Sequence, residues 1–432
     1  MFHDGRSTMT WDGHLPRPAT GGTSEDVRRH NLGALLGHLH AEGPLSRTEL
    51  ARRTGLNRST IAALVAELAT AGAVREDRPE RAAAGAGRPS LVVSPRGDHV
   101  QVLAAEVGVD RVDVALVGLG GEVRSRRHRR LGASCRPGAV AALVGRMVRD
   151  LRDDPAAGGA VVALGLALPG VIRNADGFVR FAPNLGWVDE HFGATVSREV
   201  PDLPVRIGND ADVGALAEHL RGVARGSDHL VFIAGDVGVG GGVIVAGRPL
   251  LGAGGYAGEV GPMVVRPGGL LCRCGARGCW ETEIGVPAIT RALGGGRMSA
   301  RELVRAIRRS ATTDPQALDG VGRYLGIGIG SIVNLVNPEL VVIGGVLREV
   351  FPVARAAVES SLGRTALAAP GEQVRLVLPG LGGDAVLVGA AELAWAVLLA
   401  DPLTTLRRHP APRPAPDLAA APDLAPAPAP AP

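Results

Sequence analysis

The chain has 432 residues, which is long for one ordinary domain and sufficient for a small domain followed by a two-lobed one. Its 46% hydrophobic and 21% charged residues exclude a chain that is disordered throughout. The net charge of +4 is too small for this length to indicate nucleic-acid binding by itself. All 47 basic residues are arginines, which excludes phosphate-binding loops built around a lysine.

Cysteine usage and hydropathy narrow the class of protein further. Four cysteines in a chain of this length do not form a disulfide framework, and the clustering of Cys272, Cys274 and Cys279 indicates a metal site. The first residues lack a signal pattern, and the apolar stretches near 160–172 and 230–247 are too short or too interrupted to span a bilayer. We therefore expect a soluble, cytoplasmic protein.

The two ends of the chain lack the periodicity of folded elements. Residues 1–24 are rich in Gly, Thr, Pro and His and are expected to be a disordered leader. Residues 406–432 end in a Pro-Ala repeat that cannot bury a core and are expected to be a disordered tail. Between them the pattern changes at a Gly/Ala/Arg/Pro linker over 79–90. The predicted domains are therefore residues 25–97, which are mainly helical, and residues 98–405, which alternate strands and helices.

The smaller domain begins with an amphipathic helix. Leucines recur at helical spacing over residues 27–41, and Gly43-Pro44 ends the helix. Ser46-Arg47-Thr48-Glu49 then matches a capping box, in which the Ser46 hydroxyl and the Glu49 carboxylate satisfy backbone donors at a helix start. After a turn at Thr54-Gly55, Asn57 can cap a third helix, and together these segments predict a helix-turn-helix. The apolar face of the third helix carries Ile61, Leu64, Val65 and Leu68.

The start of the third helix is where base edges are expected to be read, because this end of the second helix of the motif faces the major groove. An arginine that contacts a base through two hydrogen bonds discriminates by about 1 to 3 kcal/mol. The alternative is an ordinary three-helix core whose arginines are merely solvated. The predicted DNA-binding residues of the two helix starts are Ser46, Arg47, Asn57, Arg58, Ser59 and Thr60.

A wing is predicted after the third helix. Residues 73–76 and 90–93 resemble two short strands, with Arg78, Arg81 and Arg88 between them. Arg88 stands in a Gly-Arg-Pro segment that can place it in a narrow minor groove, where the negative potential is enhanced. The capping box, the turn and the basic wing together favour DNA binding over the solvated three-helix core.

The larger domain opens with strands. Residues 103–123 are interpreted as two strands joined by a turn at Val109-Asp110, and a third strand is expected over 124–131. The arginine run of this third strand is interpreted as its solvated face rather than as a second nucleic-acid patch. Distinctive segments then follow in the order 161–170, 182–187, 208–212 (Gly-Asn-Asp-Ala-Asp), 238–242 (Gly-Val-Gly-Gly-Gly), 257–261 (Ala-Gly-Glu-Val-Gly), 272–281 (from Cys272 to Glu281), 337–339 and Gly344-Gly345.

In this order the segments closely resemble the ROK family of repressors and sugar kinases. The resemblance covers about residues 27–400, and the ordered combination is far more specific than any single motif. The Arg29-His30-Asn31-Leu32 start and the stretch over 46–51 match the repressor branch. The resemblance implies an α/β protein with an N-terminal winged helix-turn-helix and a ROK domain of actin-like fold, with two ribonuclease-H-like lobes around a cleft.

The resemblance also implies a sugar pocket lined by Asn209, Asp210, Glu259 and Glu281, with Asn184 from a nearby loop. Carboxylates and amides recognise sugar hydroxyls because they accept and donate hydrogen bonds in fixed directions. In the family's kinases the residue at Asp210 is the base that deprotonates the attacking sugar hydroxyl. Other roles stay open: Asn209-Asp210 can be a helix cap, Glu259 a turn residue, and Glu281 a support of the cysteine loop.

The first phosphate loop of the family's kinases begins Asp-x-Gly-Gly-Thr, whereas this chain has Glu106-Val107-Gly108-Val109-Asp110. Without the second glycine and the threonine, the backbone cannot approach phosphates as closely and a hydroxyl donor is lost. The Gly-rich stretch over 238–242 is retained, but it fits a tight strand turn equally well. We therefore expect a sensor without catalytic activity rather than an enzyme.

The predicted metal site also departs from the family. The family places a histidine after Gly-Glu-x-Gly, where it binds zinc and touches the sugar, and this chain has Pro262 instead. Cys272, Cys274 and Cys279 can still hold a structural zinc ion, with a water or another residue as the fourth ligand. The alternative is a reduced, metal-free loop, and the same substitution leaves open whether the ligand is altered, weakly bound or absent.

Taken together, the sequence predicts a transcriptional regulator, acting as a repressor of carbohydrate uptake or catabolism genes. Its expected partners are a double-stranded DNA operator, a sugar or sugar-derivative effector, and further copies of the chain in a homodimer or higher homo-oligomer, since helix-turn-helix dimers bind half-sites about one helical turn apart. An effector that moves the lobes would mismatch that spacing. The alternatives are a ROK-type sugar kinase with an accessory DNA-binding domain and an effector-independent regulator with a decayed pocket.

Overall fold

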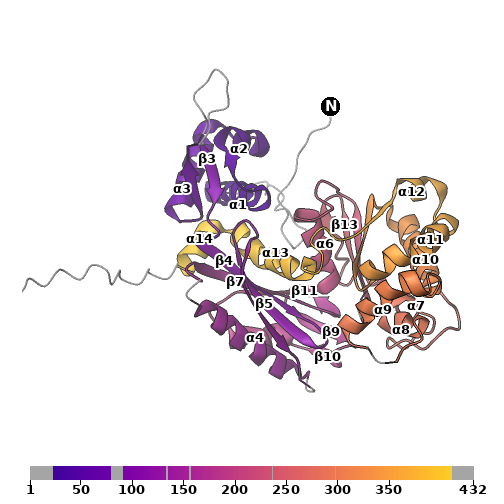
Figure 1. Ribbon diagram of the computed structural model, residues 1–432. Coiled ribbons are helices and arrows are strands. Elements are labelled where there is room, and N and C mark those ends of the chain that lie inside the picture. Colours follow the sequence, from indigo (N-terminus) through magenta and orange to yellow (C-terminus); the bar gives the residue numbers. More distant parts are fainter. Residues whose placement is uncertain are drawn as a thin grey trace, which may run out of the picture.

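A small N-terminal domain sits on one lobe of a larger two-lobed body (Figure 1). The computed structural model describes residues 23–78, 91–132, 135–154, 157–235, 237–296 and 298–410. Helix α1 (Ser24–Glu42) already includes Ser24, and the last helix, α14 (Pro402–Arg408), extends to Arg408. The rest of the predicted leader and tail, the linker and Arg88 lie outside the described residues, so those predictions stay untested.

The N-terminal domain is a winged helix-turn-helix. Three helices pack around leucine and isoleucine side chains of the predicted stripes, including Leu35, Leu39, Leu50 and Ile61, because the apolar positions recur at helical spacing. A three-stranded sheet of order β1-β3-β2 completes the domain, and β2 and β3 form the base of the predicted wing. Besides α1, its elements are α2 (Arg47–Thr54), α3 (Arg58–Thr70), β1 (Leu45–Ser46), β2 (Val74–Asp77) and β3 (Val92–Pro95).

The predicted capping box of α2 forms only in part. The Ser46 hydroxyl accepts a hydrogen bond from the Glu49 backbone N–H at 3.1 Å. The Glu49 carboxylate does not return to Ser46 but accepts from Arg52 at 2.7 Å and from Arg53 at 2.9 Å. Charged donors three and four residues along the same helix face compete with the neutral backbone donor, which explains the difference. The reciprocal pattern occurs instead at the start of α1, where Thr23 and Asp26 cap each other.

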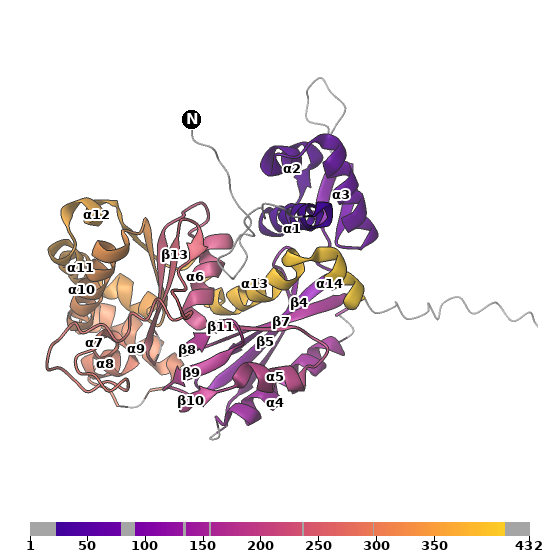
Figure 2. The same cartoon turned by 180° about the vertical axis from the view of Figure 1, so that it is seen from behind.

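The first lobe of the large domain is built on a five-stranded sheet of order β11-β7-β4-β5-β6. Helices α4 and α5 cover one face, and α6 and α13 lie against the other (Figure 2). Successive side chains of β4 alternate between the two cores, as in a sheet covered on both faces. The predicted third strand is β6, an exposed edge strand. The bounds are β4 (Val100–Val107), β5 (Arg111–Gly118), β6 (Val123–Arg130), β7 (Ala160–Leu168), β11 (Val205–Asn209), α4 (Pro137–Arg152), α5 (Phe192–Glu199), α6 (Asp210–Leu220) and α13 (Ala385–Ala400).

A small antiparallel sheet extends from this lobe, with strands β8 (Val171–Arg173), β9 (Phe178–Ala182) and β10 (Trp187–Glu190). The second lobe repeats the plan with a five-stranded sheet of order β14-β13-β12-β15-β16. Two such lobes give the α/β architecture that the ordered motifs predict. The second lobe comprises β12 (Leu230–Gly235), β13 (Val239–Val245), β14 (Arg248–Pro249), β15 (Leu340–Gly345), β16 (Arg375–Val377), α7 (Trp280–Ile284), α8 (Val286–Ala292), α9 (Ala300–Thr313), α10 (Asp319–Val336), α11 (Leu347–Thr365) and α12 (Ala368–Gln373).

Helix α6 is wedged between the lobes at backbone contact distance. A Cβ on Gly242 of β13 would lie 2.2 Å from the Ala211 carbonyl oxygen, and a Cβ on Gly389 of α13 would lie 2.0 Å from that of Val213. Helix α1 approaches α13 in the same way, because a Cβ on Gly33 would lie 2.1 Å from the Leu399 carbonyl oxygen. Only glycine fits at these three positions. In consequence β13 packs directly on α6, α6 on α13, and α13 on α1.

The lengths and compositions of the described helices bear on whether the chain could cross a lipid bilayer. Within the described ranges, no single helix is both long and apolar enough to cross one. Helices α13 and α14 meet the length and composition criteria only as a pair bent by 104°.

Gly389→Ala is expected to destabilise the protein by about 1 to 3 kcal/mol, because the new methyl group would overlap the Val213 carbonyl and force α6 away from α13. Urea denaturation followed by circular dichroism measures the effect. Gly363→Ala is the matched control, since Gly363 is also helical but has open space around it. That substitution should stabilise by about 0.5 to 1 kcal/mol. Equal stability of the Gly389 variant and the unmodified chain would contradict the wedged packing.

Candidate functional site

The glycine-rich start of β13 forms the floor of a polar site at the lobe interface. A Cβ on Gly238 would lie 3.1 Å from Asn184 Nδ2 and 3.2 Å from Glu281 Oε2. A Cβ on Gly240 would lie 3.7 Å from Asp210 Oδ1. Glycine therefore keeps this floor open, and the structure brings three of the predicted pocket residues to it from three separate segments of the chain.

Asn209 holds the start of α6 in place. Its Oδ1 accepts hydrogen bonds from the backbone N–H groups of Ala211 at 2.8 Å and Asp212 at 3.2 Å, which makes it the helix N-cap. Its Nδ2 donates to the Gly170 carbonyl at 2.8 Å. Asn209 thus fulfils the capping role that the sequence left open, and a direct contact with a ligand stays a prediction.

Carboxylates crowd the site. Asp212 is only 8% exposed, and its Oδ1 would lie 3.8 Å from a Cβ on Gly258, next to Glu259. Burial, together with Glu259 and Asp210, raises the pKa of Asp212 well above its usual value. Burial and the neighbouring Glu281 likewise raise the pKa of Glu259. The site therefore concentrates like charges, and it favours ligands that donate hydrogen bonds to carboxylates.

Asp212 was not among the predicted site residues. It stands two residues after Asp210 in the Asn-Asp-Ala-Asp segment, so both aspartates occupy the first turn of α6. The sequence places Asp212 near the site but gives no sign that it is buried. Another residue that was missed is Arg273, whose guanidinium donates to Asn184 Oδ1 at 2.5 Å and so joins the cysteine loop to the pocket.

The three clustered cysteines converge as predicted. The sulfur atoms of Cys272, Cys274 and Cys279 all lie within 4.8 Å of one another, a spacing that could hold a metal ion. The Cys272 thiol donates to Glu281 Oε1 at 2.7 Å, so the loop and the pocket share one carboxylate. Three thiols at this separation fit the donor set of a structural zinc site, for which sulfur is a preferred ligand.

The position of the kinases' first phosphate loop is occupied by a closed turn between β4 and β5. The Gly108 backbone N–H donates to the Arg111 carbonyl at 2.8 Å. The Arg111 guanidinium pairs with Glu106 at 2.8 Å and with Asp113 at 3.2 Å. The Glu106 carboxylate is thus neutralised by an arginine of the following strand.

The predicted DNA-binding residues divide into exposed and internally bonded groups. Arg58 and Ser59 are exposed at the start of α3, where the Asn57 side chain accepts hydrogen bonds from the Ser59 hydroxyl at 2.7 Å and the Thr60 N–H at 2.9 Å. Arg47 instead forms a two-point ion pair with Glu76 of β2. Arg58 forms no ion pair within the described ranges, so its charge faces solvent.

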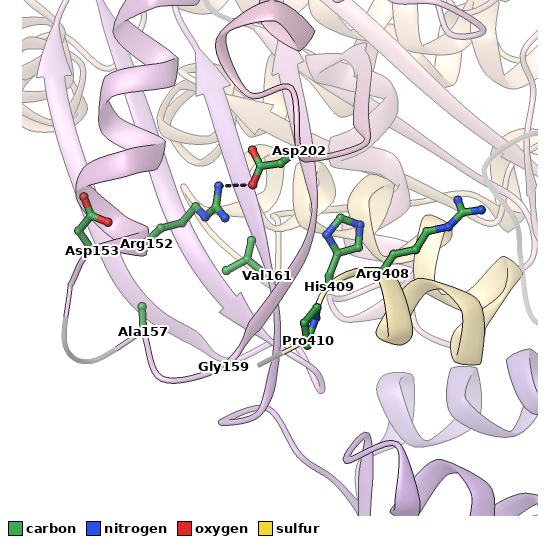
Figure 3. Close-up of a pocket in the computed structure, with 9 residues that line it drawn as sticks. All are labelled: Arg152, Asp153, Ala157, Gly159, Val161, Asp202, Arg408, His409 and Pro410. Atoms are coloured by element: carbon green, nitrogen blue, oxygen red, sulfur yellow. Dashed lines mark ion pairs between the residues drawn. The ribbon is translucent and has the colours of Figure 1, made fainter. Parts of the chain in front are cut away.

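A separate surface pocket of about 360 Å³ lies beside the end of α14 (Figure 3). Arg152 and Asp202 line it and form an ion pair at 2.7 Å, with Arg408 and His409 on the other side. It contains none of the predicted DNA-binding, sugar-binding or metal-binding residues. The pocket is therefore distinct from the carboxylate site between the lobes.

Comparison with known families agrees with this architecture. The model of the ROK family matches residues 102–397, and a model of the MarR family matches residues 33–83. The chain belongs to the ROK family. The N-terminal domain is accordingly a MarR-like winged helix, and the two lobes have the actin-like fold of the family's sugar kinases.

Individual relatives include both regulators and kinases. The chain is 27% identical to the xylose repressor of Bacillus subtilis over 369 residues, which cover 85% of this chain and 95% of the repressor. It is 26% identical to the transcriptional dual regulator NagC of Escherichia coli over 368 residues, covering 81% and 88% of the two chains. A glucokinase of Halalkalibacterium halodurans is 31% identical over 251 residues, covering 54% and 76%.

Solved structures give the same picture. A ROK family transcriptional regulator described as a homologue of the Escherichia coli Mlc protein matches with a TM-score of 0.74 at 26% identity, covering 88% of this chain and 99% of that chain. A ROK family glucokinase from Streptomyces griseus, in complex with glucose and AMPPNP, matches with a TM-score of 0.59 at 26% identity. That match covers 68% of this chain and 99% of the glucokinase.

Asp212→Asn is expected to stabilise the protein at pH 7 by roughly 1 to 3 kcal/mol, because an amide is buried here at lower cost than a carboxylate. The raised folded-state pKa means that Asp212 costs stability once the pH exceeds its usual value of 3.8. The cost grows as the pH rises toward the folded pKa. Urea denaturation between pH 3 and pH 8 should show the gain at neutral pH and its loss below 3.8.

Asp110→Asn provides the control, since the Asp110 side chain is 81% exposed. Its stability should follow that of the unmodified chain at every pH. If Asp212→Asn gained nothing over this control at pH 7, the assignment of Asp212 as a destabilising buried carboxylate would be wrong.

Proposed function

We propose that the protein is a DNA-binding transcriptional regulator that represses carbohydrate uptake or catabolism genes. The observation that carries the proposal is the joining of a winged helix, with Arg58 exposed at the start of α3, to two ROK lobes with a cluster of carboxylates at their interface. The similarity to xylose repressor and NagC spans both parts of the chain, which supports the same assignment. The site of action is the cytoplasm, where an operator is accessible.

The start of α3 is the part of the N-terminal domain suited to the major groove. Arg58 and Ser59 are exposed there, and the Asn57 cap, which accepts from the Thr60 N–H, fixes the helix start that carries them. Arg47 can reach DNA only by giving up its pairing with Glu76, so we assign it the lesser role. Arg88 in the wing remains part of the proposed interface.

The proposed effector is a sugar or sugar derivative in the carboxylate pocket. Asp210, Glu259 and Glu281 are acceptors for hydroxyl groups, and Asn184 and Asn209 add amide donors and acceptors. The similarity to proteins named xylose repressor and N-acetylglucosamine repressor supports a sugar or sugar derivative as the effector. A buried site that satisfies hydroxyl groups discriminates strongly against molecules that lack them.

We propose that the lobes bind this effector without transferring phosphate. The turn that replaces the first phosphate loop is closed by the pairing of Glu106 with Arg111, and it offers no hydroxyl donor at Val109. The proposed regulator acts as a homodimer, so that movement of the lobes changes the spacing of two α3 helices on DNA.

Arg58→Ala is expected to weaken binding to the operator by about 1 to 3 kcal/mol and to relax sequence choice, because a base contact is lost. Genomic fragments selected by the purified protein supply the DNA, and fluorescence anisotropy at two salt concentrations supplies the affinities. Arg129→Ala, at an exposed position of β6, is the control and should leave the affinity unchanged.

Two results would contradict the proposed function. One is the failure of the purified protein to select any genomic fragment in a salt-sensitive manner. The other is ATP-dependent phosphorylation of D-glucose, D-xylose or N-acetylglucosamine that Asp210→Asn abolishes, which would favour a sugar kinase with an accessory DNA-binding domain.

We further propose that the three cysteines bind one structural zinc ion. Cys274→Ser should abolish stoichiometric zinc in metal analysis and lower the thermal midpoint, because zinc bound only by the folded loop stabilises it. Cys135→Ser is the control, since Cys135 contacts Val109 and lies outside the cluster. Purified protein that contains no metal, and whose stability does not respond to added zinc, would contradict the proposal.

A further inference from the structure

A buried polar cluster joins the N-terminal domain to the first lobe. It consists of His40 of α1, Glu392 of α13 and Arg221 at the carboxyl end of α6, and we name it the interdomain cluster. His40 is 3% and Glu392 6% exposed. Glu392 lies 3.1 Å from His40 Nε2 through Oε2 and accepts from Arg221 Nε through Oε1. Three segments that are distant in sequence therefore meet at one carboxylate.

Arg221 and His40 also bind backbone groups of the neighbouring elements. Arg221 donates to the Gly120 carbonyl at 2.9 Å and to the His40 carbonyl at 3.2 Å. The latter bond satisfies a carbonyl in the last turn of α1, where a positive charge is also favourable. The Gly120 N–H donates to His40 Nδ1 at 3.0 Å. The turn between β5 and β6 is thus held by both residues.

The two ring nitrogens of His40 have different partners. An N–H can only donate, so Nδ1 accepts from Gly120, whereas Nε2 lies 3.1 Å from Glu392 Oε2 and 2.5 Å from the Arg221 Nη2 donor. Burial lowers the pKa of His40, and Arg221 lowers it further, while the Glu392 carboxylate opposes the shift. Burial opposes ionisation of Glu392, but Arg221 and His40 together lower its pKa to about 2. The cluster therefore holds a deprotonated Glu392 against both Arg221 and His40.

Such a cluster fixes orientation more strictly than apolar contact does. Leucine side chains can slide past one another at little cost, whereas a buried charge that loses its partner strongly destabilises the structure. The contact between α1 and α13 is otherwise apolar and close, as the approach of Gly33 to Leu399 shows. The interdomain cluster therefore selects one orientation of the N-terminal domain on the lobe.

Helix α6 connects this cluster to the carboxylate pocket. Its first turn carries Asp210 and Asp212, and its carboxyl end leads directly to Arg221, roughly 16 Å away at 1.5 Å per residue. Gly242 and Gly389 bring the backbones of β13 and α13 into contact with α6, so α6 cannot shift without displacing them. A displacement of the first turn must therefore move the carboxyl end as well.

The carboxyl end of α6 is further tied to the segment that precedes α13. Glu218 of α6 is fully buried and accepts hydrogen bonds from the backbone N–H groups of Gly380 and Leu381, both at 2.9 Å. It also accepts from the Val223 N–H at 2.8 Å. Movement of α6 would therefore displace both Arg221 and α13, and α13 carries Glu392.

We propose that Arg221, Glu392 and His40 are positioning residues that set the orientation of the N-terminal domain, and that α6 transmits changes in the carboxylate pocket to them. The first part depends only on the contacts of the cluster. The second part rests on the proposed function, in which pocket occupancy controls the placement of α3 on DNA.

The first part is tested by the distance distribution between spin labels on Thr70 of α3 and Val188 of the first lobe, introduced in the full chain as unnatural amino acids. Both positions are exposed. Arg221→Met should make the distribution at least about twofold broader while circular dichroism stays unchanged, because a buried charge loses its partner. Arg152→Met, which breaks a partly exposed ion pair on the same lobe, is the matched control and should leave the width unchanged.

A width that is unchanged in Arg221→Met would overturn the positioning role. If that variant fails to fold, the same distance measurement on Glu392→Gln tests the positioning role. This substitution keeps the size of the side chain and one acceptor oxygen but removes the charge. Broadening in Glu392→Gln then supports the role, and an unchanged width overturns it.

The second part is tested by Asp210→Asn, which removes one charge from the crowded pocket at the other end of α6. It should shift the mean label distance in the unmodified chain, and the shift should be lost in the Arg221→Met background. Asp110→Asn is the control. No shift with Asp210→Asn, or the same shift in both backgrounds, would overturn transmission through α6. Neither measurement uses DNA or a sugar, so failure of the proposed function would be seen separately.

Discussion

The direct contact of helix backbones around α6 is the constraint on which the rest of the structure depends. Gly242 of β13 and Gly389 of α13 bring both backbones against carbonyl groups of α6, so that α6 is held directly between the two lobes. Interiors packed in this way have two or a few discrete arrangements rather than a continuum. The pocket at one end of α6 and the interdomain cluster at the other are therefore parts of a single mechanical unit.

Local patterns in the sequence predicted the N-terminal domain and the α/β class of the rest, whereas the two-lobed fold followed from the family resemblance of the ordered motifs. The leucine stripe of α1, the Ser46 and Asn57 caps, and the ordered Gly-rich motifs of the lobes all depend on residues that are near one another in the chain. Asn184, Asp210 and Glu281 also come together, as do the three cysteines, because the turns and helix starts that carry them lie at one interface between the lobes. Caps and glycine turns of this kind are determined locally, which is why they can be recognised in a sequence.

The features that were missed depend on distant partners. His40 and Glu392 are separated by 352 positions, and neither stands in a motif, so no spacing rule brings them together. The burial of Asp212 depends on the approach of the second lobe to α6. The reciprocal capping bond predicted for Glu49 involves only nearby residues, but it does not form because Arg52 and Arg53 compete for the carboxylate. Competition between partners is settled by side-chain packing, which a residue pattern does not encode.

The apolar core of the N-terminal domain continues into the first lobe, from Leu35 and Leu39 of α1 to Trp395 and Leu398 of α13. The two parts consequently share one core. Removal of the winged helix would expose apolar side chains of α13 such as Trp395 and Leu398, which are fully buried in this chain. Lobes that stood alone would therefore need polar residues on this face of α13 to remain in solution.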